Sequence, residues 1–447
     1  MIERFFHLRE HGTTPGREVI AGCTTFAAMA YILVVNPTIL ADAGMPREAL
    51  VTATALGAAL ATLLMAFLAN LPLALAPGMG INAFFAYAVC IGMGIPWQSA
   101  LGFVFINGLI FLALSLGGIR RRIIHAIPAS LKAAIAAGIG LFIAFIGLKN
   151  GGLVVDHPAT FVALGDLTRP SVALCFAGIL LTCVLVARKT PAAILVAVAV
   201  ISAAGFFVPD GNGGRVTALP GSPVSLPASL EPLFLQLDFG YLLREPLKSL
   251  PVILTLLLVD MFDNIGTLIG VTKRAGLMND QGELPGIQRA LTADSLAAIL
   301  SSLLGTSTVV SYIESATGVQ AGGRTGLTGV VVAGLFLLSL FLTPVILAIP
   351  GVAVAPALVV VGILMFESVA EIDLSRFEIA APAVLTIAAM PMTFSISTGM
   401  GIGLIAAVVI ALASGRGKEN LTPFTIGLAV VFVLHFLEPL LMRAAGS

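Results

Sequence analysis

The sequence contains very little charge. Only 10 % of its 447 residues are charged, whereas 58 % are hydrophobic, and the mean hydropathy is +1.06. A soluble protein of this length needs far more polar surface, so the composition excludes a soluble enzyme or binding domain. Basic and acidic residues balance at 23 each, so no net charge attracts nucleic acid. The chain is therefore predicted to be an all-α polytopic membrane protein.

Cysteine and histidine are also scarce. The four cysteines lie in apolar segments without the spacing of a disulfide or metal site, and the five histidines are scattered. The sequence has no Walker motif or glycine-rich nucleotide loop, which argues against ATP-driven pumping. It shows no nucleophile–base constellation, so we expect neither an enzyme nor a bound metal or cofactor.

Long apolar runs are abundant. A membrane span needs about 20 mostly apolar residues. Fifteen segments qualify: 17–38, 49–69, 72–94, 98–119, 129–148, 170–187, 190–208, 248–271, 287–304, 306–322, 326–347, 353–369, 377–394, 397–414 and 423–442. A polar, Gly- and Pro-rich interruption from 209 divides them into two halves of similar length.

Basic residues indicate the orientation. Most of them, including the run Arg120-Arg121-Arg122, lie before the first segment or after even-numbered ones. Because positive charge collects in cytoplasmic loops, we expect a cytoplasmic N-terminus in the inner (cell) membrane.

The third segment of each half is a poor continuous helix. Segment 73–94 contains Pro77, Gly78 and Gly80, and segment 305–323 combines β-branched and hydroxyl residues with glycines. In addition, 123–142 resembles 345–366, each with an Ala-Ile-Pro step. Matched broken segments and internal repeats are typical of secondary transporters with inverted repeats. Two Gly-kinked packing helices remain the simpler alternative.

Three acids occur at membrane depth. Asp260 and Asp263 lie on one face of the segment LLLVDMFDNIGTLIGV (256–271), and Glu314 lies in the second broken segment. An acid in a span is costly and usually functional, and burial favours its protonated form, which suits proton coupling. The alternative is that buried, protonated acids tie helices together.

Other polar and aromatic residues accompany these acids. Three acids, an amide and aromatic rings suit a small, flat, neutral ligand that offers N–H donors. The remaining candidate substrate-binding residues are Thr24, Phe26, Asn82, Ala83, Phe84, Thr267, Tyr312 and Ser315.

Four motifs carry a family resemblance. GCTTFAAMAYILVVNP, APGMGINAFFAY, FDNIGTLIGVTKRAG and GTSTVVSYIESATGVQAGGRTGLTG resemble the AzgA-like purine permeases of the nucleobase:cation symporter-2 group, along about residues 3–415. The resemblance implies 14 transmembrane segments in two inverted repeats of seven, with short β-strands in segments 3 and 10. It also implies import of adenine, guanine or hypoxanthine with protons, through an elevator-like movement.

The resemblance further implies two domains. A core domain would comprise 1–119 and 248–350, and a gate domain 120–208 and 351–415, with a linker at 209–247 and a tail at 416–447. The gate domain would form a homodimer contact. Glu314 and one acid of segment eight would hold the purine, the other acid would serve coupling, and Asn82 would contribute from segment three. The division of roles between Asp260 and Asp263 stays open.

Two further questions stay open at this stage. A passive nucleobase facilitator or an anion exchanger on the same architecture is the alternative function, although three acids disfavour an anion site. The segment 422–442 is apolar enough to be a fifteenth span, or it lies along the membrane surface.

Overall fold

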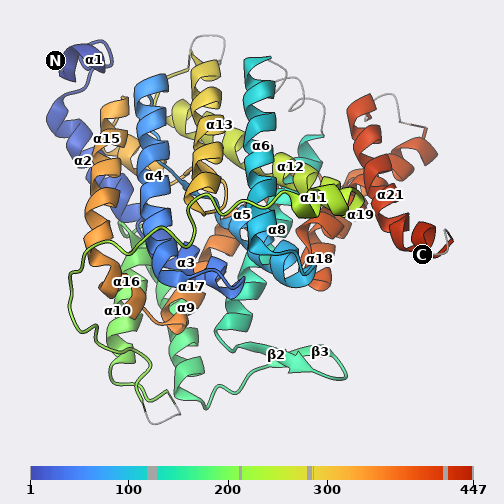
Figure 1. Cartoon of the computed structure of the whole chain (residues 1–447), viewed down its shortest axis with the longest axis horizontal. Helices are drawn as coiled ribbons and strands as arrows, with labels where there is room; N and C mark the ends of the chain where they lie inside the picture. The colour runs from blue at the N-terminus through green and yellow to red at the C-terminus, as the bar shows by residue number, and fades with distance from the viewer. Residues whose placement is uncertain are drawn as a thin grey trace.

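A computed structural model describes residues 2–117, 128–210, 214–278, 284, 286–415 and 421–444. The first half contains α1 (Ile2–Phe5), α2 (Pro15–Met29), α3 (Ile32–Asp42), α4 (Arg47–Ala69), β1 (Leu75–Pro77), α5 (Met79–Ala83), the π-helix η1 (Phe84–Gly92), α6 (Trp97–Leu116), α8 (Ala129–Asn150), β2 (Val154–His157), β3 (Phe161–Leu164), α9 (Pro170–Ala187) and α10 (Ala193–Gly205) (Figure 1).

The second half likewise consists mainly of helices and contains a short strand that is the counterpart of β1. It contains α11 (Gly240–Arg244), α12 (Pro246–Arg274), α13 (Ile287–Leu304), β4 (Val309–Ser311), α14 (Ser315–Gln320), α15 (Gly326–Ser339), η2 (Leu340–Leu342), α16 (Thr343–Ala348), α17 (Gly351–Phe366), η3 (Glu367–Glu371), α18 (Phe377–Thr393), α19 (Ile396–Ala413) and α21 (Pro423–Ala444).

The predicted all-α polytopic fold is confirmed. Eight helices of the described residues are long and apolar enough to cross a membrane, and shorter apolar helices accompany them. Both broken segments contain the expected strand, and β1 pairs with β4 in antiparallel fashion. Antiparallel pairing of equivalent strands is the arrangement that inverted repeats require. The count of fourteen spans stays a prediction.

The sequence echo between the halves corresponds to a helix pair. Pro128 and Pro350 precede the first residues of α8 and α17, and these two helices pack together. A Cβ atom on Gly140 would lie 2.6 Å from the carbonyl oxygen of Gly362, so only glycine allows this approach. Both glycines lie twelve residues after their respective prolines, at equivalent places in the two halves.

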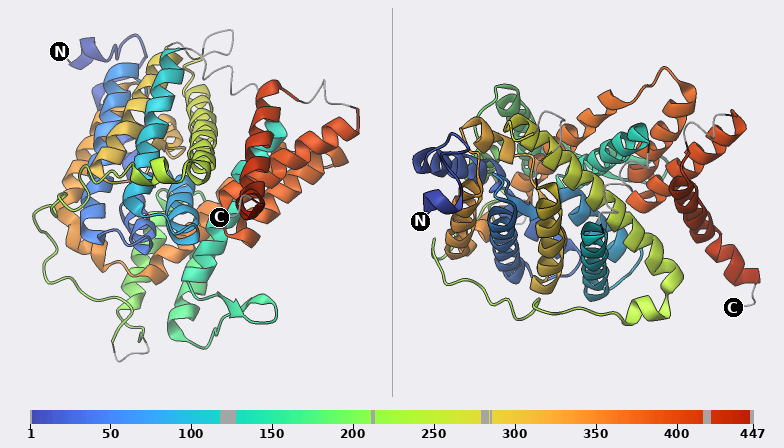
Figure 2. Two further views of the ribbon diagram at one scale, coloured as in Figure 1. Left: turned by 45° about the vertical axis from the view of Figure 1, so that its right-hand side comes forward. Right: turned by 90° about the horizontal axis from the view of Figure 1, so that it is seen from above.

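The helices pack in two groups. In one group, α2 and α4 contact α15, and α4 and α6 contact α13, around the β1–β4 pair. In the other group, α8 contacts α17 and α18, α9 contacts α10 and α17, and α18 contacts α19. Seen from the side and from above, the two groups stand next to each other (Figure 2). The division into moving core and gate domains stays a prediction.

The predicted linker, residues 209–247, lies across the first helix group and is hydrogen-bonded to it. The Thr52 hydroxyl donates to the Ala228 carbonyl at 2.9 Å, and the Ser99 hydroxyl donates to Asp238 at 2.6 Å. The Ser99 hydrogen bond lowers the pKa of the Asp238 carboxyl below its ordinary value. Leu233 is fully buried. The segment is therefore a fixed part of this helix group along much of its length.

The ends of the helices lie at two opposite faces of the molecule. Asn70, directly after α4, accepts a hydrogen bond from the Gly326 amide at 2.9 Å and donates to the Phe6 carbonyl at 3.1 Å. The end of α4 and the starts of α2 and α15 therefore meet at one face, and the β2–β3 hairpin lies at the opposite one (Figure 1). The basic residues Arg120, Arg121, Arg122, Arg416 and Lys418 lie outside the described residues.

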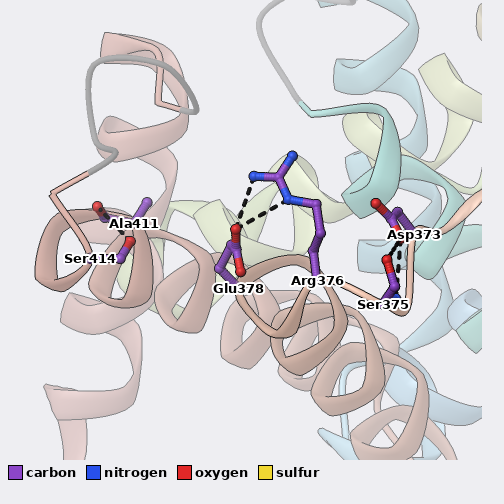
Figure 3. A network of polar contacts seen from close by, with 6 residues as sticks. All are labelled: Asp373, Ser375, Arg376, Glu378, Ala411 and Ser414. Carbon is purple, nitrogen blue, oxygen red and sulfur yellow. Dashed lines mark hydrogen bonds and ion pairs between the residues drawn. The ribbon is translucent and has the colours of Figure 1, made fainter.

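Polar side chains at the surface form hydrogen bonds and an ion pair around the start of α18. Asp373 accepts a hydrogen bond from the Ser375 amide, and Arg376 pairs with Glu378 at 2.9 Å (Figure 3). The Ser375 hydroxyl, which also donates to Asp373, lowers the pKa of that exposed carboxyl. The C-terminal segment forms the helix α21, which packs on α19; whether it spans the membrane stays open.

Candidate functional site

The centre of the candidate site is the crossing of β1 and β4. Ala76 pairs with Val310, the Tyr312 amide donates to the Ala74 carbonyl at 2.9 Å, and the Gly78 amide donates to the Thr308 carbonyl at 3.0 Å. Pro77 and Gly78 disfavour a continuous helix here, and the β-branched run in segment 305–323 favours a strand. Each strand leads into a short helix, α5 or α14, within a buried region.

Glu314 precedes α14 directly and is half-buried. The Tyr31 hydroxyl donates to Oε1 of Glu314 at 2.6 Å. Tyr31 lies at the break between α2 and α3, within a segment predicted as one continuous helix. Tyr31 lies in the motif GCTTFAAMAYILVVNP, but the sequence analysis left it out of the candidate site residues, because a tyrosine in a span often joins helices.

The two acids of α12 have different surroundings. Asp263 is half-buried and interacts electrostatically with Glu314 and with Asp294 of α13. Asp260 is buried and accepts a hydrogen bond from Nδ2 of Asn107 on α6 at 3.1 Å. Asp263 therefore lies near Glu314, whereas Asp260 is hydrogen-bonded to α6.

Asp294 and Asn107 were also missed by the sequence analysis. Asp294 is the one acid within segment 287–304 and is buried. The rule that singled out Asp260 and Asp263, that an acid in a span is usually functional, would have found it. Asn107 offers no comparable signal, because amides in spans often join helices.

Asn82, Ala83 and Phe84 lie where α5 meets η1, and all three are buried. The Ser307 hydroxyl donates to Oδ1 of Asn82. Within the described residues, Nδ2 of Asn82 has no hydrogen-bond partner. A buried amide donor without a partner is costly, so a ligand carbonyl or ring nitrogen would find a donor here.

Two of the predicted ligands hold the strand crossing together. The Tyr312 hydroxyl donates to the Pro77 carbonyl at 2.6 Å, and Oγ of Ser315 accepts from the Ala74 amide at 3.0 Å. On α12, Oδ1 of Asn264 accepts a long hydrogen bond from the Ser311 amide at 3.4 Å. These contacts position Glu314 and α12 relative to β1.

The other predicted ligands are less clearly part of the site. The Thr24 hydroxyl donates to the Ile20 carbonyl of its own helix at 2.8 Å, and the Phe26 ring packs edge-on against Phe336, 5.1 Å between centroids. Thr267 is buried on α12, one turn after Asp263. Their contact with a ligand stays a prediction.

The geometry brings together Tyr31, Asp263, Tyr312 and Glu314 from three different helical or strand segments. The carboxyl oxygens of such a cluster can accept hydrogen bonds from the N–H groups of a ligand. Among the described residues, no group of three His, Cys, Asp or Glu side chains is placed to hold a metal ion.

Sequence comparison matches residues 16–434 to the Xan_ur_permease model, described as a permease family. The adenine permease AdeP of Escherichia coli is 43 % identical over 98 % of this chain and 96 % of its own length. The guanine/hypoxanthine permease PbuG of Bacillus subtilis is 42 % identical over 98 % of this chain and 99 % of its own length.

Comparison with solved structures identifies transporters that have a similar fold. The murine anion transporter SLC26A9 has a TM-score of 0.62 at 11 % identity, covering 89 % of this chain and 68 % of that one. A second SLC26A9 structure is matched over 65 % of its length, so the chain spans about two thirds of that protein. The transmembrane domain of the cyanobacterial bicarbonate transporter BicA has a TM-score of 0.59 at 16 % identity, covering 86 % and 96 %.

Proposed function

The chain belongs to the Xan_ur_permease family of permeases, and from this premise we propose that it imports purine nucleobases together with protons. The substrates are adenine, guanine or hypoxanthine, the molecules for which the similar permeases are named. The membrane is the cytoplasmic membrane, with the N-terminus in the cytoplasm.

The cluster of Glu314, Asp263 and Tyr31 beside the strand crossing carries this proposal. A purine presents N–H donors and ring-nitrogen acceptors along one flat edge. Carboxyl oxygens accept from the donors, and Nδ2 of Asn82 can donate to an acceptor. Phe84, next to Asn82, would contribute its ring to the apolar walls.

The electrostatics of the same cluster support the proposed proton coupling. Asp263 interacts with Glu314 and Asp294, and three carboxylates cannot all be ionised cheaply in a buried place. A proton bound with the purine relieves this repulsion. Asp263 is proposed to carry the proton, Glu314 to hold the purine, and Asp260 to support α12 from its contact with α6.

Transport requires movement of one helix group against the other. We assign 1–119 and 248–350 to the core, and 120–208 and 351–415 to the gate, which also supplies the homodimer contact. A Cβ on Gly80 of α5 would lie 2.7 Å from Cγ2 of Ile139 on α8, so α8 packs directly beside the proposed site. Movement of the core along this contact would expose the site alternately to each face, as in an elevator.

An anion exchanger on the same fold is the alternative. The likeness to anion transporters concerns the fold alone, because the sequence identities are 11 % and 16 %. An anion at the strand crossing would meet Asp263 and Glu314, and like charges disfavour binding. The site therefore favours a neutral ligand.

Uptake of radiolabelled hypoxanthine, adenine and guanine into proteoliposomes tests the proposal. With the interior at about pH 7.5, accumulation is expected at an external pH near 6 and not without the gradient. Glu314→Gln and Asp263→Asn should each abolish accumulation while the protein stays in the membrane. Equilibration without accumulation would indicate a passive facilitator, and normal accumulation by both variants would refute the assigned site.

A further inference from the structure

Tyr87 joins the two helix groups at the face opposite the N-terminus. Its hydroxyl donates to Oδ2 of Asp42 at 2.7 Å, and Nδ2 of Asn150 donates to the same hydroxyl oxygen at 3.2 Å. Asp42 is the last residue of α3, and Asn150 is the last residue of α8. Tyr87 itself is buried within η1. One tyrosine hydroxyl therefore connects η1 and α3 to α8.

Phe394 reinforces this connection from a third direction. It follows α18 in a left-handed conformation, and its ring packs edge-on against Tyr87 at 6.1 Å and Phe142 at 5.3 Å. The ammonium group of Lys149 lies 5.0 Å from the centre of the same ring. The contact between the groups thus combines hydrogen bonds, aromatic edges and a cation–π interaction.

The location of this cluster in the molecule indicates its role. Asn150 immediately precedes the β2–β3 hairpin, which lies at the face opposite α1 (Figure 1). With the proposed cytoplasmic N-terminus, this is the external face. Tyr87 also shares η1 with Phe84 of the candidate site, and π-helical segments are frequent at functional sites.

We propose that Asp42, Tyr87 and Asn150 form an external latch, which holds the first helix group against α8 and closes the external path to the site. The proposal rests on the alternating access proposed above. Opening toward the outside must separate α3 and η1 from α8, and this separation breaks the hydrogen bond from Asn150 to the Tyr87 hydroxyl. Asp42 lies on the same side as Tyr87 and holds that hydroxyl in place. The latch thereby sets the balance between the inward- and outward-open states.

A cysteine reporter on α8 tests the latch. Ile146 is buried and lies one helical turn before Asn150 on the same face of α8. An Ile146→Cys variant in right-side-out membranes is treated with a membrane-impermeant maleimide, and labelling is followed peptide by peptide by mass spectrometry. Because labelling is followed for each peptide separately, the four native cysteines need not be replaced. Labelling should be slow while the latch is intact.

Tyr87→Phe removes both hydrogen bonds and keeps the ring against Phe394. We expect the labelling rate at position 146 to rise about fivefold, the effect of removing one neutral hydrogen bond between η1 and α8. Asn150→Leu removes the same hydrogen bond between η1 and α8, so it should raise the rate by a similar factor. Tyr241→Phe, the same chemical change on α11, is the matched control and should leave the rate unchanged.

Unchanged labelling in both Tyr87→Phe and Asn150→Leu would overturn the latch, as would an equal rise in Tyr241→Phe. The measurement uses no purine. A failure of the latch is therefore distinguishable from a failure of the transport proposal, which would appear in the uptake assay alone.

Discussion

The hydroxyl of Tyr31 donates a hydrogen bond of 2.6 Å to Oε1 of Glu314. This contact joins the break between α2 and α3 to the start of α14, so it links the first segment of one half to the broken segment of the other. Since a hydroxyl donor orients a carboxylate, Tyr31 fixes which oxygen of Glu314 is left for a ligand.

We predict that Tyr31→Phe raises the KM for purine uptake about tenfold or more, because a hydrogen bond to a charged group contributes about 1.5–3 kcal/mol. The ring and its packing are kept, so the protein should fold normally. Initial uptake rates at several purine concentrations measure the effect, with Tyr241→Phe as the control. An unchanged KM would mean that Tyr31 only packs.

Substitutions of the two acids of α12 should have different effects on transport. Asp263→Asn is expected to abolish uphill accumulation, because Asp263 interacts with Glu314 and Asp294. Asp260→Asn is expected to keep a pH-dependent accumulation of lower extent, since Asp260 binds Asn107 rather than the site. The amide oxygen of the new side chain can still accept from Asn107, so the thermal stability in detergent should change little.

Asn107→Leu provides the test of this separation. If Asp260 acts through α6, Asn107→Leu, which removes the donor of this hydrogen bond, should lower the stability by about 1–3 kcal/mol and keep proton coupling. Loss of coupling in Asp260→Asn with a normal melting temperature would instead assign the coupling role to Asp260.

The broken segments could be predicted because their cause is local. Pro77 and Gly78 interrupt a helix wherever they occur, and the acids of α12 stand out against an apolar background. The pairing between segments has no such signal. Tyr31 and Glu314 are 283 residues apart, and Asn107 and Asp260 are 153 apart. Only the packing of the two halves determines these neighbours, so the sequence alone does not select Tyr31 or Asn107.

Close packing between α2 and α14 predicts a strong effect at Gly318. A Cβ atom there would lie 2.6 Å from the Ala21 carbonyl oxygen and would also meet the Thr25 hydroxyl. Gly318→Ala must therefore push α14 away from α2, which we expect to cost about 1–3 kcal/mol and to weaken purine binding by moving Glu314. Thermal unfolding and binding by calorimetry measure the two effects.

The matched control is Gly334→Ala on α15, where an added Cβ would have open space. This change should be neutral or slightly stabilising, since alanine favours a helix over glycine. Equal melting temperatures for the two variants would contradict the close approach of α14 to α2.

Glu18 of α2 should be essential for stability and not for coupling. It is fully buried at the start of α15, where it accepts from the Arg324 amide at 2.9 Å and from the Thr328 hydroxyl at 2.6 Å. A carboxylate at a helix N-terminus matches both the free N–H groups and the helix dipole. Glu18→Gln replaces one accepting oxygen by an N–H donor that faces other donors, so we expect a loss of about 2 kcal/mol or more.

Glu48→Gln is the control for this prediction, because Glu48 occupies the first turn of α4 but is exposed. There the charge contributes only about 0.3–1 kcal/mol, so the melting temperature should change little. In Glu18→Gln, protein that remains folded should still accumulate purine in response to a pH gradient, since Glu18 binds backbone and hydroxyl donors. A stable Glu18→Gln protein that has lost accumulation would show instead that Glu18 belongs to the proton path.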